Sequence, residues 1–149
     1  MPTLSLKLTP PVDDARAASL AQALTAVTAD TLGKRAGVTA VLIEPLAVAH
    51  WHVNGRPVMR PTARLQIDVT AGTNSEAQKA RFIKAAFKEL QQQLAPGAAL
   101  EPASYVIVHE PASYVIVHEL AAQDWGYGGI TQAARQAQRK ANVVSESPV

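Results

Sequence analysis

The sequence predicts an α+β protein made of two consecutive βαβ units. Three observations carry this prediction: apolar and polar residues alternate in two stretches, a helical pattern follows each stretch, and an apolar run follows each helix. The second series starts about sixty residues after the first, as in an internal repeat. We expect one domain over residues 1–149, with pseudo-repeats 2–57 and 63–130 and a C-terminal tail, 131–149.

The composition suits one packed domain. Apolar residues make up 48% of the 149 residues and charged residues 17%, which favours a core over disorder. The net charge is +2 and the 14 basic residues are scattered, which argues against nucleic acid as a partner. Without cysteine there is no disulfide framework. No stretch resembles a signal peptide or a membrane span, so we expect a cytoplasmic protein without a membrane partner.

The first unit is predicted from residues 3 to 57. Residues 3–8 alternate as a strand with its three leucines on one face. A helix is expected over 13–34, with acidic residues in its first turn and Gly33 at its end. A nearly all-apolar strand follows at 39–44, typical of a parallel sheet covered by helices. Asn54-Gly55 predicts a tight turn.

The second unit repeats this order. Residues 63–69 alternate as a strand, and the stretch from Thr73 to Glu76 fits a capping box at the start of a helix. Apolar residues at helical spacing continue to Pro96-Gly97, which ends the helix. Another strand and the glycine-rich turn DWGYGG (124–129) follow, and the tail is expected to hold one short helix.

The strand of the second unit is duplicated. The nonapeptide EPASYVIVH occupies 101–109 and again 110–118. An odd insertion in one continuous strand would reverse the facing of every repeated side chain, and Pro111 lacks an N–H, so two separate segments are predicted. Because the second copy joins the following hairpin directly, we expect it to fill the strand position. The first copy would then form an extended loop or an added edge strand.

This pattern resembles the tautomerase superfamily, whose simplest member is 4-oxalocrotonate tautomerase. The chain begins Met1-Pro2, a βαβ unit follows, and each unit ends in Glu, several residues, an aromatic and a glycine turn (EPLAVAHWHVNG and ELAAQDWGYGG). The two-unit form is similar to the fused members, in which one chain replaces a dimer. The resemblance implies a four-stranded core sheet, two helices on one face, hairpin extensions and a homotrimer.

The resemblance also implies a function. Once Met1 is removed, Pro2 would be the general acid/base that isomerises a small 2-oxo or enol acid, without a cofactor. An α-amine has a pKa of about 8. Burial or nearby cations would lower this pKa, and a neutral amine can move a proton next to a carbonyl. The chain is therefore expected to be a keto–enol isomerase.

The chain departs from the family at the positions that match its substrate-binding arginines. Those positions hold Thr70 and Thr73, with Thr39 in the first unit and Tyr105 or Tyr114 in the second. Hydroxyl groups hydrogen-bond a carboxylate but supply no positive charge. The missing arginines put a 2-hydroxymuconate-type substrate in doubt.

Other residues complete the expected site. Trp125 matches the family's pocket-wall aromatic and Tyr127 follows it; either forms the pocket wall or packs at a subunit interface. The predicted substrate-binding residues are therefore Thr70, Thr73, Tyr114, Trp125 and Tyr127. Four arginines near strand ends are further candidates: Arg35, Arg56, Arg60 and Arg64. The position matching Pro2 in the second unit is Ala63, whose amide cannot act as a base, so one site per chain is expected.

One metal-binding motif is rejected, and two alternative functions stay open. His50 and His52 form an HxH pair, but no third ligand stands at a recognisable spacing, so no metal site is predicted. Within the superfamily, a dehalogenase or decarboxylase is the alternative enzyme. In another class, the chain would be a ligand-binding or scaffold protein that keeps the fold without the activity.

Overall fold

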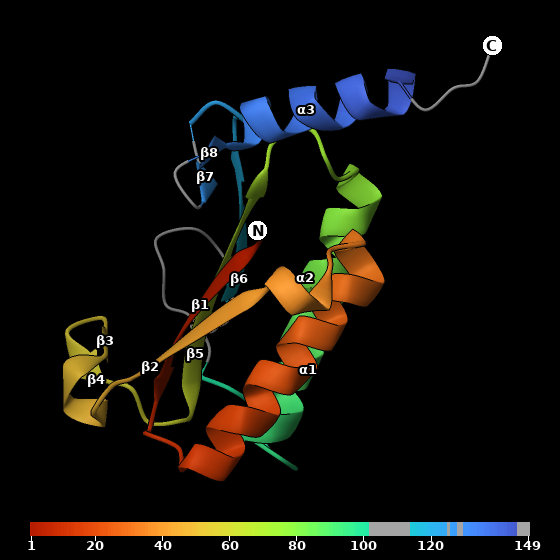
Figure 1. Cartoon of the computed structure of the whole chain (residues 1–149). Helices are drawn as coiled ribbons and strands as arrows, with labels where there is room; N and C mark the ends of the chain where they lie inside the picture. The colour runs from red at the N-terminus through yellow and green to blue at the C-terminus, as the bar shows by residue number, and fades with distance from the viewer. Residues whose placement is uncertain (102–113, 125, 128–129, 146–149) are drawn as a thin grey trace.

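The computed structural model describes residues 1–101, 114–124, 126–127 and 130–145 (Figure 1). The predicted α+β fold is confirmed. In this part of the chain a four-stranded sheet has the order β2-β1-β5-β6. β1 and β2 are parallel, β5 and β6 are parallel, and β1 and β5 are antiparallel, so two βαβ units join through their first strands. The strands are β1 (Thr3–Thr9), β2 (Ala40–Pro45), β5 (Thr62–Thr70) and β6 (Tyr114–Leu120).

Helices α1 (Asp14–Leu32) and α2 (Glu76–Leu94) cover the same face of the sheet (Figure 1). In α1 the Asp13 side chain accepts a hydrogen bond from the Arg16 backbone N–H at 2.7 Å. Gly33 ends α1 in the left-handed region, with φ 63°, and its N–H donates to the carbonyl of Ala29. The predicted start and end of the first helix are therefore confirmed.

The capping box of α2 lies two residues later than predicted. Ser75 is the N-cap, its side chain accepts from the Gln78 N–H, and the Gln78 side chain accepts from the Ser75 N–H. Thr73 does not cap the helix, because its hydroxyl donates to the Thr70 carbonyl at 2.7 Å. The sequence motif pointed to Thr73 and Glu76. In the structure Thr73 belongs to the turn after β5, and the helix begins only after Ser75.

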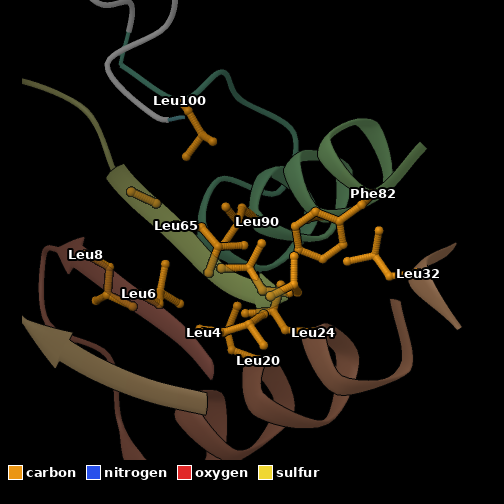
Figure 2. Packing of buried hydrophobic residues seen from close by; sticks show 14 of the residues in the cluster. Leu4, Leu6, Leu8, Leu20, Leu24, Leu32, Leu65, Phe82, Leu90 and Leu100 are labelled. Atoms are coloured by element: carbon orange, nitrogen blue, oxygen red, sulfur yellow. The ribbon is translucent and has the colours of Figure 1, made fainter. Parts of the chain in front are cut away.

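The core lies between the sheet and the two helices (Figure 2). The alternating apolar residues of β1 and β5 point toward α1 and α2, as predicted, and each leucine buried in this way contributes about 1.5–3 kcal/mol. The fully buried side chains include Leu4, Leu8, Leu20, Leu24, Leu65, Ile67, Phe82 and Leu90. The apolar strand β2 pairs in parallel with β1, as its sequence suggested, but it is less buried than β1. β2 is an edge strand covered on one face, and Leu42 is 60% exposed.

Two hairpins extend the units. β3 (His52–Val53) pairs with β4 (Arg56–Pro57) through Asn54 (φ 52°) and Gly55 (φ 70°), which confirms the predicted turn. Short 3₁₀ helices, η1 (Ala36–Val38) and η2 (Val48–His50), flank β2. In the second unit β7 (Gly126–Tyr127) pairs with β8 (Ile130–Thr131).

The tail forms helix α3 (Gln132–Ser145), longer than the short helix expected. The Ala134 N–H donates to the Thr131 hydroxyl at 3.2 Å, and the Ala133 N–H donates to the Ala122 carbonyl at 2.9 Å. Figure 1 shows α3 lying across the end of the sheet where β5 and β6 end. None of the helices in the described ranges combines the length and apolar character needed to cross a bilayer.

The second copy of the duplicated nonapeptide supplies most of β6, which confirms the predicted choice of copy. Tyr114 lies beside Arg64 and Leu120 beside Thr70 in the register with β5. All but the first residue of copy 1 lies outside the described residues, so its expected loop or edge strand stays a prediction.

Candidate functional site

The topology brings three chain segments to Pro2. β1 and β5 run antiparallel with Thr3 beside Asp68, so the start of β1 lies next to the end of β5. α1 runs back along the sheet and β2 restarts in parallel, so the end of α1 returns to the same place. The Ala40 N–H donates to the Pro2 carbonyl at 3.0 Å. Pro2 therefore lies next to residues that follow α1 and to the last residues of β5.

Pro2 is buried and borders a small pocket of about 40 Å³. The pocket is lined by Met1, Pro2, Lys34, Val69 and Thr70. The α-amino group in the structure is that of Met1, beside this pocket. Removal of Met1 would move the amine one residue inward, to Pro2.

Lys34 is the basic residue among those that line this pocket. It follows Gly33, whose left-handed backbone ends α1, and its Nζ donates a hydrogen bond to the Thr73 hydroxyl at 2.8 Å. The Thr73 hydroxyl in turn donates to the Thr70 carbonyl at 2.7 Å. The lysine of the first unit is thus held by the loop that follows the strand of the second.

A buried amide reinforces this junction. The Asn74 side chain, 9% exposed, donates to the Leu32 carbonyl at 2.9 Å. Leu32 ends α1, so its carbonyl has no partner within the helix. The amide satisfies this group and fixes the distance between the two units at the pocket.

The electrostatics of the pocket favour a neutral amine. The pKa of the α-amino group is lowered from 8.0, first by burial and then by the charges of Lys34, Arg139 and Arg135. Burial also lowers the pKa of Lys34, whereas the charge of Glu119 raises it. Glu119 lies beside Val69 in the sheet and pairs with Lys79 at 3.5 Å.

The structure brings together some of the residues that the sequence suggested. Thr70 lines the pocket, and Thr73 holds Lys34. Tyr114 lies beside Arg64, at the other end of the sheet from Pro2, so one chain does not bring it to this pocket. The backbone of Tyr127 is in β7, and Trp125 is outside the described residues.

The remaining arginine candidates do not lie at this pocket's lining. Arg35 is exposed, and its carbonyl accepts from Thr39 at 2.9 Å. Arg56 is in the exposed β4 strand, and Arg64 donates to Gln66 at 3.0 Å. Arg60 precedes β5, at the end of the sheet away from Pro2.

The charged residues around the amine were missed from the sequence. Lys34 was not among the predicted site residues, although its neighbour Arg35 was named as a candidate. Its place follows from the βαβ topology, because the residue after the crossover helix returns to the start of the first strand. Arg135 and Arg139 carried no comparable signal, since only the packing of α3 brings them near the pocket.

The chain is similar to several solved structures. The wild-type R7 fused 4-OT, an asymmetric trimer, is 26% identical over 90% of this chain and 98% of its own, with a TM-score of 0.74. The chain shares the fused tautomerase fold. Native fused 4-OT is 27% identical over 89% and 97%, with a TM-score of 0.69. Pt0534, solved after inactivation by 2-oxo-3-pentynoate, is 18% identical over 89% and 98%, with a TM-score of 0.70.

The resemblance to the tautomerase superfamily that the sequence indicated is thereby confirmed, in its fused two-unit form. No family model and no curated protein matches the chain.

Proposed function

We propose that the chain is a tautomerase that isomerises a 2-oxo or enol acid, with the α-amine of Pro2 as general acid/base once Met1 is removed. One observation carries the proposal: Met1 and Pro2 line a small pocket, and burial together with the charges of three cations lowers the pKa of the Met1 α-amine from 8.0. A lowered pKa leaves a larger fraction of an amine neutral at a given pH, and the neutral form is able to accept a proton. The solved fused 4-OT structures support the same assignment.

In this mechanism the neutral amine of Pro2 removes a proton from the carbon next to the substrate carbonyl. Negative charge then moves to the carbonyl oxygen, where the Lys34 ammonium stabilises it. The protonated amine returns the proton to another carbon of the conjugated system, which completes the isomerisation. Lys34 provides a point charge rather than the two-pronged contact of an arginine. It supplies charge that Thr70 and Thr73 lack.

We also propose a homotrimer, as in the solved fused 4-OT trimers. β2 and β6 are the edges of the sheet in the described residues, and Leu42 on β2 is 60% exposed. A neighbouring chain would cover such an edge. Trp125 and Tyr127 are the aromatic candidates for the pocket wall or for this subunit interface.

A direct test compares the wild type with Pro2→Ala in the ketonisation of phenylenolpyruvate. Mass spectrometry first establishes that Met1 is absent. We expect Pro2→Ala to lower kcat/KM by about tenfold or more, within the range of general-base effects. The matched control is Pro61→Ala, because the Pro61 carbonyl also accepts one backbone hydrogen bond at 3.0 Å, from Glu101. Equal activity, or equal inactivity, of the wild type and Pro2→Ala would rule out the catalytic proline and favour a ligand-binding role.

A covalent probe tests the amine independently. A conjugated ynone such as 2-oxo-3-pentynoate accepts a nucleophilic amine at its β-carbon, and the amine proton moves to the α-carbon. We expect stoichiometric inactivation and a mass increase equal to the whole probe, mapped to Pro2. Labelling elsewhere, with activity retained, would contradict the proposal.

A further inference from the structure

Either copy of the duplicated nonapeptide offers the residues that β6 requires. β6 runs from Tyr114 to Leu120, and its first six residues, YVIVHE, recur unchanged at 105–110. The last strand position differs, because a shift of the chain by nine residues puts Pro111 where Leu120 stands. The amino-acid sequence of the strand therefore hardly distinguishes copy 1 from copy 2.

The contacts of β6 use side chains that both copies carry. Val115 and Val117 pack against the core between the sheet and the helices. Glu119 pairs with Lys79 of α2, with 3.5 Å between Oε1 and Nζ. The residues nine positions earlier are chemically identical: Val106, Val108 and Glu110. A shift of the chain by nine residues would therefore rebuild the same core contacts and the same ion pair.

The connection from α2 is long enough for this shift. The Glu101 N–H donates to the Pro61 carbonyl at 3.0 Å, which holds the chain beside the start of β5. Arg64, the β5 residue beside Tyr114, is three residues further along β5, a span of about 10 Å. Tyr105 follows Glu101 by four residues, which reach up to about 14 Å. The shift thus places Tyr105 beside β5 without breaking the bond of Glu101.

The last position of the strand favours copy 2. The Ala71 N–H donates to the Leu120 carbonyl. Because the N–H and C=O of one strand residue point to the same side, Leu120 also offers its N–H to β5. Pro111 has no N–H and would leave this position of the ladder without a donor. The arrangement with copy 2 in β6 is therefore the more stable of two closely similar ones.

The hairpin β7–β8 and helix α3 follow whichever copy fills the strand. The Ala133 N–H at the start of α3 donates to the Ala122 carbonyl at 2.9 Å, so α3 is held to the chain just after β6. In the structure this segment directly follows Leu120, which lies beside Thr70 of the pocket lining. With copy 1 in β6, nine more residues, 112–120, would separate the segment from the strand.

We propose that either copy of the nonapeptide fills β6, and that exchange between the copies controls how closely the hairpin β7–β8 is held to the pocket of Pro2. The exchange is a slip of the chain by nine residues along β5. Its effect on the pocket rests on the proposed tautomerase function, for which Tyr127 of this hairpin is a candidate wall residue. The arrangement with copy 2 in β6 is the active one, and the other arrangement lacks this wall.

The stability test places a charge at the core-facing valine of each copy. The variants are Val106→Asp, Val115→Asp and the two combined. We expect Val106→Asp to leave the urea midpoint unchanged. Val115→Asp should lower the midpoint, but only as far as the poorer fit of copy 1 requires. The combined variant should lower it much further, because either copy would then bury a carboxylate. Circular dichroism follows the unfolding.

The matched control is Val115→Asp in a chain that lacks 101–109. With a single copy no exchange is possible, so this protein should be as unstable as the combined variant of the full chain. If Val115→Asp is equally harmful with and without the first copy, copy 1 does not replace copy 2, and the exchange is overturned.

Engineered disulfides locate each copy directly, because the chain contains no cysteine. Gln66 lies beside Ile116 in the β5–β6 register, so Gln66→Cys/Ile116→Cys locks copy 2. Gln66→Cys/Ile107→Cys locks copy 1, since neighbouring strands lie about 4.8 Å apart, within the range of a disulfide. The control, Gln66→Cys/Val106→Cys, puts the second cysteine on the opposite face of the strand. We expect intrachain disulfides in the first two proteins and little in the control. If the Ile107→Cys protein forms none, or links two chains, the exchange is overturned.

The locked proteins also test the link to the pocket. We expect kcat/KM for phenylenolpyruvate to be at least about tenfold lower with copy 1 locked than with copy 2 locked, and to recover when the disulfide is reduced. Equal activity of the two locked proteins would overturn the control of the hairpin. A wild type without turnover would overturn the tautomerase proposal alone, because the disulfide pattern and the urea midpoints decide the exchange independently.

Discussion

The two βαβ units share their backbone plan. A proline precedes the first strand of each, and its carbonyl accepts a hydrogen bond at 3.0 Å, from Ala40 to Pro2 and from Glu101 to Pro61. A glycine with φ near the left-handed helix value follows each long helix, 63° at Gly33 and 73° at Gly97. Both helices pack on the same core.

The units differ where chemistry is expected. The residue after the left-handed glycine is Lys34 in the first unit and Ala98 in the second. The family resemblance aligns Pro2 with Ala63 in the second unit, and Ala63 is buried within β5 and has an amide nitrogen. The two halves thus share the βαβ topology, whereas the N-terminal amine and Lys34 both belong to the first half. From the second half, Thr70 lines the pocket beside Pro2, and the Thr73 hydroxyl accepts a hydrogen bond from Lys34.

The largest expected effect concerns the shared core. Phe82→Ala in α2 should lower the free energy of unfolding by about 3–5 kcal/mol, and Leu24→Ala in α1 by about 2–5 kcal/mol, because both side chains are fully buried. Since the helices share one core, each variant should unfold in a single transition. Denaturant titration followed by circular dichroism measures both. Two separate transitions, one per unit, would show that the halves are independent.

A smaller effect is expected at the junction between the units. Asn74→Ala leaves the Leu32 carbonyl buried without its partner, which costs about 1–3 kcal/mol. The control is Gln78→Ala, which removes the exposed capping contact with the Ser75 N–H and should cost less than about 1 kcal/mol. Equal losses in the two variants would mean that the amide does not join the units.

Lys34→Gln tests the asymmetry of charge. The charge of Lys34 lowers the pKa of the α-amine at this pocket, after the larger effect of burial, so its removal should let this pKa rise. A base acts in its neutral form, and the rising limb of the pH–rate profile should therefore move to higher pH, with a lower rate at pH 7. Ala98→Lys places a cation after the left-handed Gly97 of the second unit and should leave the profile unchanged. If the rising limb of the Lys34→Gln profile stays at the wild-type pH, Lys34 does not act on the amine.

Local patterns predicted the fold well and the site in part. The alternation of β1 and β5 and the caps of α1 depend on neighbouring residues, so the sequence alone predicted them. The edge position of β2 and the charges of α3 depend on contacts distant in the chain, which periodicity does not record. Lys34 lies between these two cases, because the predicted βαβ crossover would have indicated that the residue after the helix returns to the start of the first strand.

The smallest expected effect comes from the nonapeptide duplication. Glu101 is bound to Pro61 through its backbone, and Tyr114 lies beside Arg64, only three residues along β5. Three strand residues span about 10 Å, whereas the twelve residues 102–113 that join these points reach roughly 40 Å when extended. The chain between the two anchors is therefore much longer than the gap requires.

Deleting 101–109 regenerates the same anchors, because the remaining copy again begins with Glu and Pro and continues through Ala and Ser to Tyr114. The four steps from Glu to Tyr reach up to about 14 Å, enough for the gap without moving β6. We expect the free energy of unfolding to change by less than about 1 kcal/mol and the assembly mass to change only by the deleted residues. Val115→Asp is the contrast, since it places a charge at a β6 position packed against the core and should destabilise strongly. A deletion as harmful as Val115→Asp, or one that changes the number of subunits, would show that the first copy is part of the fold.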